Sequence, residues 1–555
     1  MIRTLLKGFT ALLIVIVIII AWALTINKPQ QHNFKHYSLP KDIRTLQQNW
    51  TADIRQQMSH TSFGSQILPL SWLLNLEHPY NPSMLIDARN MEALGFIPQQ
   101  HATNNTYGLP LGFSIDAKEG EDWAGLTCAA CHTAIVEFGA HKILIDGGAG
   151  QLDFVQFEQT LFQAVGLTLR EPERFERFAK AIPSTPTAQL KQELSQWHDK
   201  TAKRLAINKT QTPYGYGRLD AFGIIFNTVA VDALGVATNV RAPDAPVSIP
   251  VLWDASHLDV VQWNGSAPNK EPGPLGQNVP TALAVYGNIT MEANSFGGYS
   301  SSVRVKNLGY MQSRYYKLTA PSWPQDLLGK LNQEQMQQGE KLYQAHCQQC
   351  HLVANSIDAK RQYTATLIPV DSIGTDPVMA DNFVDRRVSS GFLAGKNLAI
   401  IGGGKLADEV APIDLVINAA VGVMLKKPFN TLSALAAEFQ FNLPSPTLEN
   451  QKVYKARQLN GIWTSAPYLH NGSVPSLWDL LTPEELRPTR FYTGSRQLDT
   501  QKVGYQSTVI ENAPLPAATT LFDTSLYGNS NAGHNFGTAL TATQKWALIE
   551  YLKSL

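Results

Sequence analysis

The four cysteines of the chain form two pairs, and a histidine directly follows each pair. The two segments are Cys128-Ala-Ala-Cys131-His132 and Cys347-Gln-Gln-Cys350-His351. In such a segment one helical turn brings both thiols to the two vinyl groups of a haem, and the adjacent histidine is placed to bind the iron. The sequence therefore predicts two covalently bound haem c groups, with His132 and His351 as iron ligands.

Two other uses of paired cysteines fit the chain less well. Zinc sites usually separate their cysteine pairs by about 12–20 residues, whereas more than two hundred residues intervene here. A redox-active dithiol or a structural disulfide needs no histidine after the second cysteine. We therefore favour haem at both segments. A calcium ion would be compatible with such a protein, but no feature of the sequence indicates one.

The amino terminus carries a membrane-directed segment. Arg3 and Lys7 precede residues 9–26, which include no charged side chain. A run of about 18 residues is near the lower limit for a transmembrane helix, and Ala21 and Ala23 offer an alternative as a signal cleavage site. We favour an uncleaved anchor over a cleaved signal, and a buried soluble helix fits least. Because the positive charge precedes the apolar run, the body is expected in the periplasm, anchored to the inner membrane.

Composition sets few limits on partners. Lys plus Arg equals Asp plus Glu at 45 each among 555 residues, so no overall field favours nucleic acid. The length allows roughly two to four domains. The 39 glycines and 32 prolines indicate many irregular connections. The sequence therefore predicts a mainly α fold with long loops and no nucleic-acid partner.

The carboxyl-terminal third indicates a small cytochrome c domain built on two helices. Asn332 is placed to cap a helix running toward His346, and Thr541 with Gln544 forms a capping box for a final helix. The apolar positions at helical spacing are Met336, Gly339 and Tyr343 in the first helix, and Leu548, Tyr551 and Leu552 in the last. We expect the two helices to cross closely at the glycine. Two unrelated amphipathic helices are the alternative, because periodicity does not say which helices touch.

The region around the first cysteine pair is more irregular. Glycines and a proline precede it, and no long amphipathic helix leads in. Helices are expected near residues 154–165 and 171–181, and the proline-rich residues 321–324 give the best domain boundary. The predicted organisation is a membrane segment at 1–30, an amino-terminal haem domain at 31–325 and a cytochrome c domain at 326–555.

Several further segments resemble a known group of proteins. They are residues 125–132 with 145–148, residues 217–221, residues 262–265, Gly533-His534-Asn535-Phe536-Gly537, and Ala466-Pro467-Tyr468-Leu469-His470-Asn471-Gly472-Ser473-Val474-Pro475. Together they resemble the bacterial di-haem cytochrome c peroxidase superfamily, and especially its rubber-oxygenase-like branch. The last string is the most specific. The resemblance implies two cytochrome c-type domains that face each other, with the amino-terminal domain enlarged by insertions.

The same resemblance implies a division of labour between the haems. The haem on His132 would meet O₂ or H₂O₂, and the other haem would transfer electrons with His351 and His534 as its axial pair. In the peroxidases a methionine ligand follows the motif around residue 470, but this chain has no methionine after Met424. The carboxyl-terminal haem should therefore be bis-histidine and of lower potential than a His/Met haem. This departure favours the oxygenase-like branch over the peroxidases.

Two side chains take their expected roles from the resemblance alone. Trp263 resembles the family's interhaem tryptophan, which helps electrons cross and is the one residue assigned to catalysis. His470 is expected to bind a haem propionate as a cofactor-binding residue. The alternatives are a core tryptophan and a structural turn. Arg218 and Asp220 are expected to form an ion pair that fixes a loop.

Three functions follow from these expectations. The favoured one is a periplasmic di-haem oxidoreductase, peroxidase-like or oxygenase-like, that activates H₂O₂ or O₂ and exchanges electrons with a small donor or acceptor protein. The alternative is a pure electron-transfer cytochrome without substrate turnover, and a haem-based sensor or scaffold is the third. The large amino-terminal domain favours the enzyme, because a carrier needs fewer residues around each haem.

Overall fold

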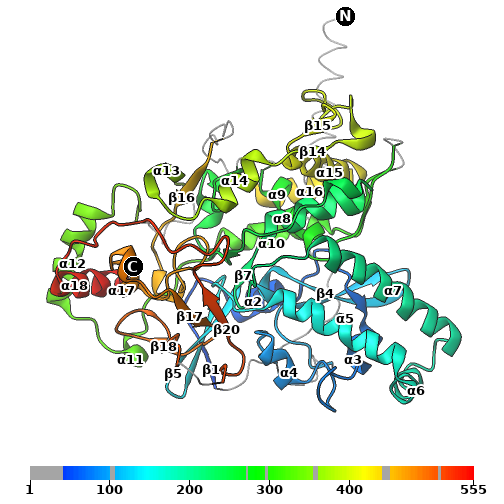
Figure 1. The fold of residues 1–555 in the computed structure, drawn as a ribbon, viewed down its shortest axis with the longest axis horizontal. Coiled ribbons are helices and arrows are strands. Elements are labelled where there is room, and N and C mark those ends of the chain that lie inside the picture. Colours follow the sequence, from blue (N-terminus) through cyan, green and yellow to red (C-terminus); the bar gives the residue numbers. More distant parts are fainter. Residues whose placement is uncertain are drawn as a thin grey trace, which may run out of the picture.

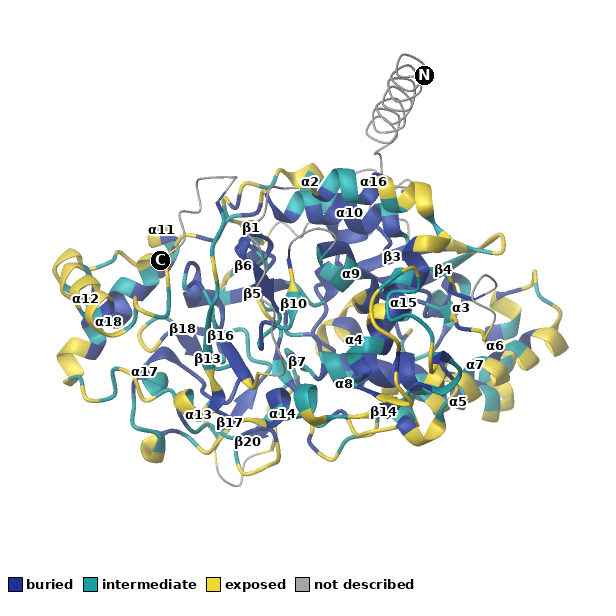
Figure 2. Cartoon of the chain, turned by 90° about the horizontal axis from the view of Figure 1, so that it is seen from above, coloured by how far each residue is buried: buried dark blue, intermediate teal, exposed yellow. Residues whose placement is uncertain are grey.

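The structure is a computed structural model that describes residues 42–99, 107–269, 273–293, 298–353, 361–439, 451–510 and 514–555. The body is elongated, and its long axis lies horizontally in Figure 1. Helices α5 (Phe154–Arg170), α6 (Pro172–Ala181) and α7 (Thr187–Ile207) lie at one end, and α12 (Gln333–His346) and α18 (Ala542–Ser554) lie at the other. Exposed residues gather on the outer helices α6, α7 and α12, whereas buried residues fill the middle (Figure 2).

Two small sheets surround the first cysteine pair. One has the order β2-β4-β3, and the other has the order β1-β6-β5. Their strands are β1 (Ile43–Thr45), β2 (Leu68–Pro69), β3 (Phe113–Lys118), β4 (Glu121–Leu126), β5 (Thr133–Phe138) and β6 (His141–Asp146). Glu119 and Gly120 both have positive φ, as the two-residue turn between β3 and β4 requires. This half of the protein therefore contains more β-structure than the expected mainly α fold, although helix is more abundant than strand among the described residues.

The helices after the first motif agree with the sequence pattern. The expected helices near residues 154–165 and 171–181 are confirmed as α5 and α6, and α5 runs five residues further than predicted. The sequence pattern gave no prediction for α7, which packs along α5. Together these helices cover the apolar cluster that contains Phe113 and Phe157.

One core spans both sides of the predicted domain boundary. Helix α10 (Val305–Tyr315) packs most closely on α16 (Pro428–Glu438), and α9 (Gly273–Ala284) packs on α15 (Pro412–Lys426). Gly309 sits so close to α16 that a side chain there would meet the backbone of Ala434 at 2.4 Å. Residues on both sides of position 325 therefore share one contiguous core.

The two helices predicted for the carboxyl-terminal domain are confirmed, and they pack against each other. The side chain of Asn332 accepts a hydrogen bond from the backbone N–H of Gln335 at 3.1 Å and so caps α12. Thr541 and Gln544 form the predicted capping box of α18. At the crossing, a side chain on Gly339 would lie 2.0 Å from the carbonyl oxygen of Ala547. The crossing therefore requires glycine.

Replacing Gly339 by alanine should destabilise the protein by about 1–3 kcal/mol, because the new methyl group meets backbone rather than a flexible side chain. Denaturant unfolding of the purified protein measures the change. The matched control is Gln338→Ala, one residue earlier on the exposed side of α12, which should be neutral within about 0.5 kcal/mol. Equal stability of the two variants would contradict the close crossing.

The predicted membrane segment at residues 9–26 lies outside the described residues. Within the part of the chain that the structure describes, no helix combines the length and the apolar character needed to cross a bilayer.

Candidate haem-binding sites

The first cysteine pair forms a tight turn between β4 and β5. Thr127 begins the 3-10 helix η1 (Cys128–Ala130) by accepting a hydrogen bond from the N–H of Ala129 at 3.2 Å. The N–H of His132 donates to the carbonyl oxygen of Cys128 at 2.9 Å, which completes one helical turn. Both thiols and the histidine therefore lie on a single turn, as haem attachment requires.

The imidazole of His132 is held by a backbone acceptor. Its Nδ1 lies 2.9 Å from the carbonyl oxygen of Pro250. A carbonyl oxygen only accepts, so Nδ1 carries the proton and Nε2 keeps a free lone pair. Histidines that bind metals typically donate a hydrogen bond from the other ring nitrogen to such an acceptor, because this bond fixes the tautomer and the ring orientation.

The second cysteine pair follows α12 directly and has the same geometry. The N–H of His351 donates to the carbonyl oxygen of Cys347 at 2.9 Å. The Nδ1 of His351 lies 2.8 Å from the carbonyl oxygen of Arg457, so this imidazole also presents Nε2. The hydroxyl of Tyr343 donates to the carbonyl oxygen of His351 and ties the motif to α12.

His534 lies opposite His351, although 183 positions separate them in the sequence. The ring centroids of the two imidazoles are 6.1 Å apart. Metal–imidazole bonds of about 2 Å on both sides would separate two ring centroids by about 6 Å. The described residues therefore fit a haem iron between these two side chains.

The loop that carries His534 is held in place by buried polar contacts. His534 has a φ of +50°, and its N–H donates to the carbonyl oxygen of Ile373 at 2.9 Å. The guanidinium of Arg487, buried in the protein, donates to the carbonyl oxygen of Gly533 at 2.8 Å. The Nδ1 atom of His534 is buried and has no partner among the described residues. The positive φ of His534 is unusual for a residue other than glycine, and such a backbone conformation persists only where the surrounding contacts hold it.

Burial keeps the candidate iron ligands neutral. It lowers the pKa of His132 to about 4. Burial, with a smaller contribution from the nearby His351, lowers the pKa of His534 to about 3, and burial also lowers the pKa of His351. Because a histidine binds metal through its neutral imidazole, all three side chains are in the protonation state that ligation needs at neutral pH.

A cavity of about 180 Å³ lies between His351 and His534, and the residues predicted for the second site line it. Cys347, Cys350, Trp263 and His470 all line it, together with apolar side chains from α18 and from residues 477–481. His470 is buried and stacks on Tyr454, with a ring separation of 4.0 Å. Burial and, to a smaller extent, the charge of Arg218 lower the pKa of His470 to about 3, so this side chain is neutral.

One short extended segment, residues 247–250, connects the two sites. The N–H of Ser248 donates to the carbonyl oxygen of His470 at 2.8 Å, and the indole N–H of Trp263 donates to the carbonyl oxygen of Ser248 at 3.0 Å. Two residues later, Pro250 accepts from His132. No sequence motif marks this segment. Backbone carbonyl acceptors have no residue signature, so only the flanking prolines Pro246 and Pro250 could have marked it.

The expected ion pair between Arg218 and Asp220 is absent. Arg218 Nη2 donates to the side-chain oxygen of Asn529 at 2.6 Å. Asp220 instead accepts hydrogen bonds from the N–H groups of Gly223 at 2.8 Å and Ala245 at 3.0 Å. The prediction was wrong because Asp220 caps helix α8 (Ala221–Asn227). The carboxylate is therefore occupied by backbone donors.

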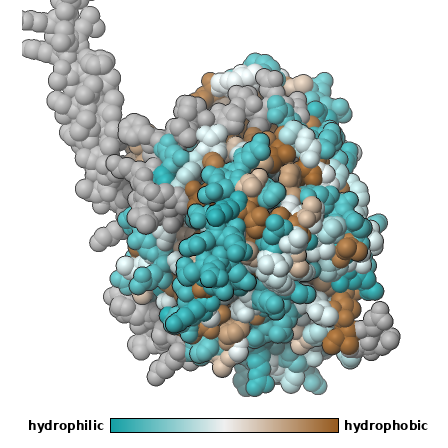
Figure 3. Space-filling model, turned by 90° about the vertical axis from the view of Figure 1, so that its left-hand side faces the viewer, coloured by the Kyte–Doolittle hydropathy of each residue, from teal (hydrophilic) through white to brown (hydrophobic). Residues whose placement is uncertain are grey.

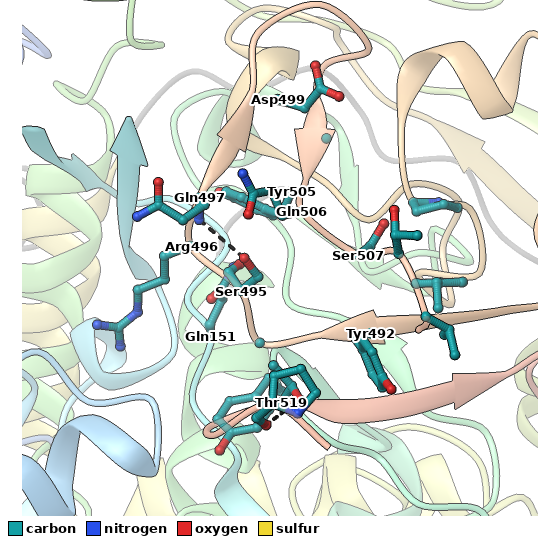
Figure 4. A pocket seen from close by; sticks show the side chains of 18 of the residues that line it. Gln151, Tyr492, Ser495, Arg496, Gln497, Asp499, Tyr505, Gln506, Ser507 and Thr519 are labelled. Carbon is teal, nitrogen blue, oxygen red and sulfur yellow. Dashed lines mark hydrogen bonds between the residues drawn. The ribbon is translucent and has the colours of Figure 1, made fainter. Parts of the chain in front are cut away.

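A larger cavity, of about 890 Å³, lies between strands β17 (Arg490–Thr493), β18 (Leu498–Asp499) and β19 (Gly504–Tyr505). Polar side chains such as Gln151, Arg496 and Gln497 line it (Figure 4). None of the predicted haem-attachment or ligand residues lines this cavity. Its size alone therefore does not make it the reactive site.

Comparisons with known proteins give two similar sequences and one matching region. Residues 453–492, which contain His470, match a family described as RoxA-like, cytochrome c-like. The chain is 30% identical to an uncharacterized protein of Sinorhizobium fredii named y4iJ, over 92% of this chain and 93% of that protein. It is 25% identical to a second uncharacterized protein of the same organism, y4iM, over 57% of this chain and 67% of that protein.

Proposed function

We propose that this chain, which belongs to the same family as y4iJ of Sinorhizobium fredii, is a di-haem enzyme. Its RoxA-like, cytochrome c-like region indicates a haem-containing oxidoreductase and supports the proposal. The enzyme activates H₂O₂ or O₂ at a haem on His132 and passes electrons through a haem on His351. The difference between the two histidines is the observation that carries the proposal. His534 faces His351, whereas in the described part of the chain no other histidine ring is in contact with the ring of His132.

The sites at His132 and His351 are proposed to have different functions. The carbonyl oxygens of Pro250 and Arg457 orient the imidazoles of His132 and His351 and raise their basicity as ligands. A haem bound at His132 would supply the iron that meets the oxidant. An iron ligated by both His351 and His534 would have no open position, which suits electron transfer.

Trp263 is proposed to assist electron transfer between the two sites. Its indole ring lines the cavity beside His351, and its N–H is bonded to Ser248, two residues before the carbonyl group that holds His132. These contacts favour an interhaem role over that of a simple core tryptophan. A core tryptophan would need neither the cavity position nor the link to the other site.

A small redox protein is the proposed electron partner. Exposed apolar side chains stand next to both candidate ligands of the carboxyl-terminal haem: Leu352 and Val353 follow His351, and Phe536 follows His534. The end of the molecule that carries α12 and α18 shows apolar areas within a mostly hydrophilic surface (Figure 3). The sequence further supports a periplasmic body anchored by residues 9–26.

The purified protein should bind carbon monoxide in the reduced state, or cyanide in the oxidised state, at one of its two haems. The haem on His132 should respond because its sixth position is exchangeable, and the bis-histidine haem should not. Optical titration gives the fraction of haem that reacts, and electron paramagnetic resonance separates the high-spin from the low-spin iron.

The same samples decide between enzyme and carrier. Consumption of H₂O₂ or O₂ in the presence of a reductant should depend on His132 and should stop when cyanide occupies the reactive haem. Two low-spin haems that ignore both ligands would contradict the enzyme and favour the pure electron-transfer cytochrome.

A further inference from the structure

Two basic side chains line the cavity between His351 and His534, and no acidic residue is among the described residues that line it. They are Lys455, on strand β16 (Val453–Ala456), and Arg457, directly after it. Residues two apart on an extended chain point to the same side. The side chains of Lys455 and Arg457 therefore lie on the same side of the chain and line the same cavity.

Neither cation has a carboxylate partner among the described residues. Lys455 makes no ion pair there, and its Nζ atom has no hydrogen-bond acceptor. The guanidinium of Arg457 donates only to neutral oxygens, the hydroxyl of Ser465 at 3.0 Å and the carbonyl group of Gln458 at 3.3 Å. The nearest carboxylates that influence them are already engaged: Asp254 pairs with Arg361 at 3.0 Å, and Asp259 accepts from backbone N–H groups.

Two uncompensated cations inside a protein are costly. Burial and the neighbouring Arg457 lower the pKa of Lys455 to about 8. An anion bound in the same cavity would therefore compensate the two positive charges. His470 lines the same cavity but is neutral, so it supplies no negative charge to compensate Lys455 and Arg457.

We propose that Lys455 and Arg457 bind and neutralise the two propionate groups of the haem attached at Cys347 and Cys350. The inference rests on the proposed function in requiring a haem at this site. A haem carries two carboxylates, and the cavity offers two cations beside the cysteines that would attach it. Charge-assisted hydrogen bonds to carboxylates are the strong ones, and an arginine can form two of them in parallel.

The test compares Lys455→Met and Arg457→Met in the full-length, haem-loaded protein. Each should shift the midpoint potential of the low-spin haem to more negative values, because lost positive charge favours the ferric state. Each should also move the propionate-bending band in the resonance Raman spectrum. The double variant should shift the potential further, and Lys455→Arg should behave like the natural protein.

The matched control is Lys452→Met, three residues before Lys455. Lys452 is half-exposed and pairs with Asp381 at 2.8 Å and Asp385 at 2.6 Å, and it does not line the cavity. This control removes the same charge but should leave the potential and the Raman band unchanged, because exposed charges are screened. If Lys455→Met yields no folded protein, Lys455→Gln makes the same comparison.

The outcomes separate this inference from the proposed function. Full haem content with an unchanged potential and an unchanged propionate band in both variants would overturn the inference alone. A change in KM for an anionic substrate with the potential unchanged would also overturn it and assign the cations to substrate binding. A natural protein without haem at Cys347 and Cys350 would instead remove the proposed function.

Discussion

Replacing Cys128 and Cys131 together by alanine should reduce the covalent haem from two groups per chain to one, and the haem that binds carbon monoxide should be the one lost. The thiols of both motifs are the only cysteines of the chain, so no other thioether can form. Pyridine haemochrome absorbance per protein measures the content. Haem staining after boiling in denaturant shows that the remaining group is covalent.

The complementary variant sharpens the assignment. Cys347→Ala with Cys350→Ala should also leave one haem, but the low-spin spectrum should disappear and the ligand-binding spectrum should remain. Removing all four thiols should remove all covalent haem. Haem that acid acetone extracts from the natural protein, or zinc bound at either pair, would contradict the attachment prediction.

Replacing His534 by alanine should convert the carboxyl-terminal haem from low spin to high spin without loss of covalent haem. The neutral imidazole faces His351 at a ring separation of 6.1 Å, and its removal leaves one side of the iron open. A second haem should then bind carbon monoxide, and electron delivery to the haem on His132 should slow. Absorption spectra, electron paramagnetic resonance and stopped-flow reduction measure these changes.

The backbone at His534 calls for a second variant. Its φ of +50° is unfavourable for alanine, whereas asparagine tolerates this conformation. His534→Asn therefore removes the imidazole and spares the loop, and it should give the same high-spin signal. His346→Ala is the control, because His346 lines the same cavity but is exposed and makes no described ring contact with His351. An unchanged spectrum in His534→Asn, or a high-spin signal in His346→Ala, would assign the ligand to another residue.

Local signals in the sequence predicted the helices at the carboxyl-terminal end. Asn332 and the Thr541–Gln544 capping box mark helix starts through contacts within four residues, so the sequence contains the whole interaction. The close crossing at Gly339 followed because glycine at a helical apolar position has few other uses. The hairpin of β3 and β4 before Cys128 was missed, because Glu119-Gly120 is not one of the dipeptides that typically mark a two-residue turn.

Longer-range packing could not be predicted in the same way. The contact of α10 with α16 joins residues more than one hundred positions apart, and neither helix carries a mark of its partner. The boundary predicted at residue 325 rested on prolines, which report a local change of direction and not the extent of a core. One apolar cluster therefore includes residues from both sides of position 325, and the division into two domains stays a prediction.

The candidate sites, like the fold, contain some residues that local motifs predict and others that no sequence signal marks. Cysteine and histidine types at fixed spacing predicted the attachment motifs, and the resemblance supplied His534. The carbonyl groups of Pro250 and Arg457 were out of reach, because every residue has a carbonyl group. Lys455 and Arg457 belong to no sequence motif, and only the structure shows that both line a cavity with no acidic residue among its described lining residues.

The segment of residues 247–250 has a consequence for how the two sites respond to each other. Pro250 accepts from His132, and Ser248, two residues earlier, is bonded to Trp263 and His470 beside the other site. The strength of the hydrogen bond at Pro250 depends on the charge that the imidazole carries, so oxidation of an iron at His132 would pull on this carbonyl group. Free-energy coupling between two sites is reciprocal. A change of charge on a haem iron held by His351 would therefore act on one held by His132 by the same free energy, and the two midpoint potentials would be properties of the pair.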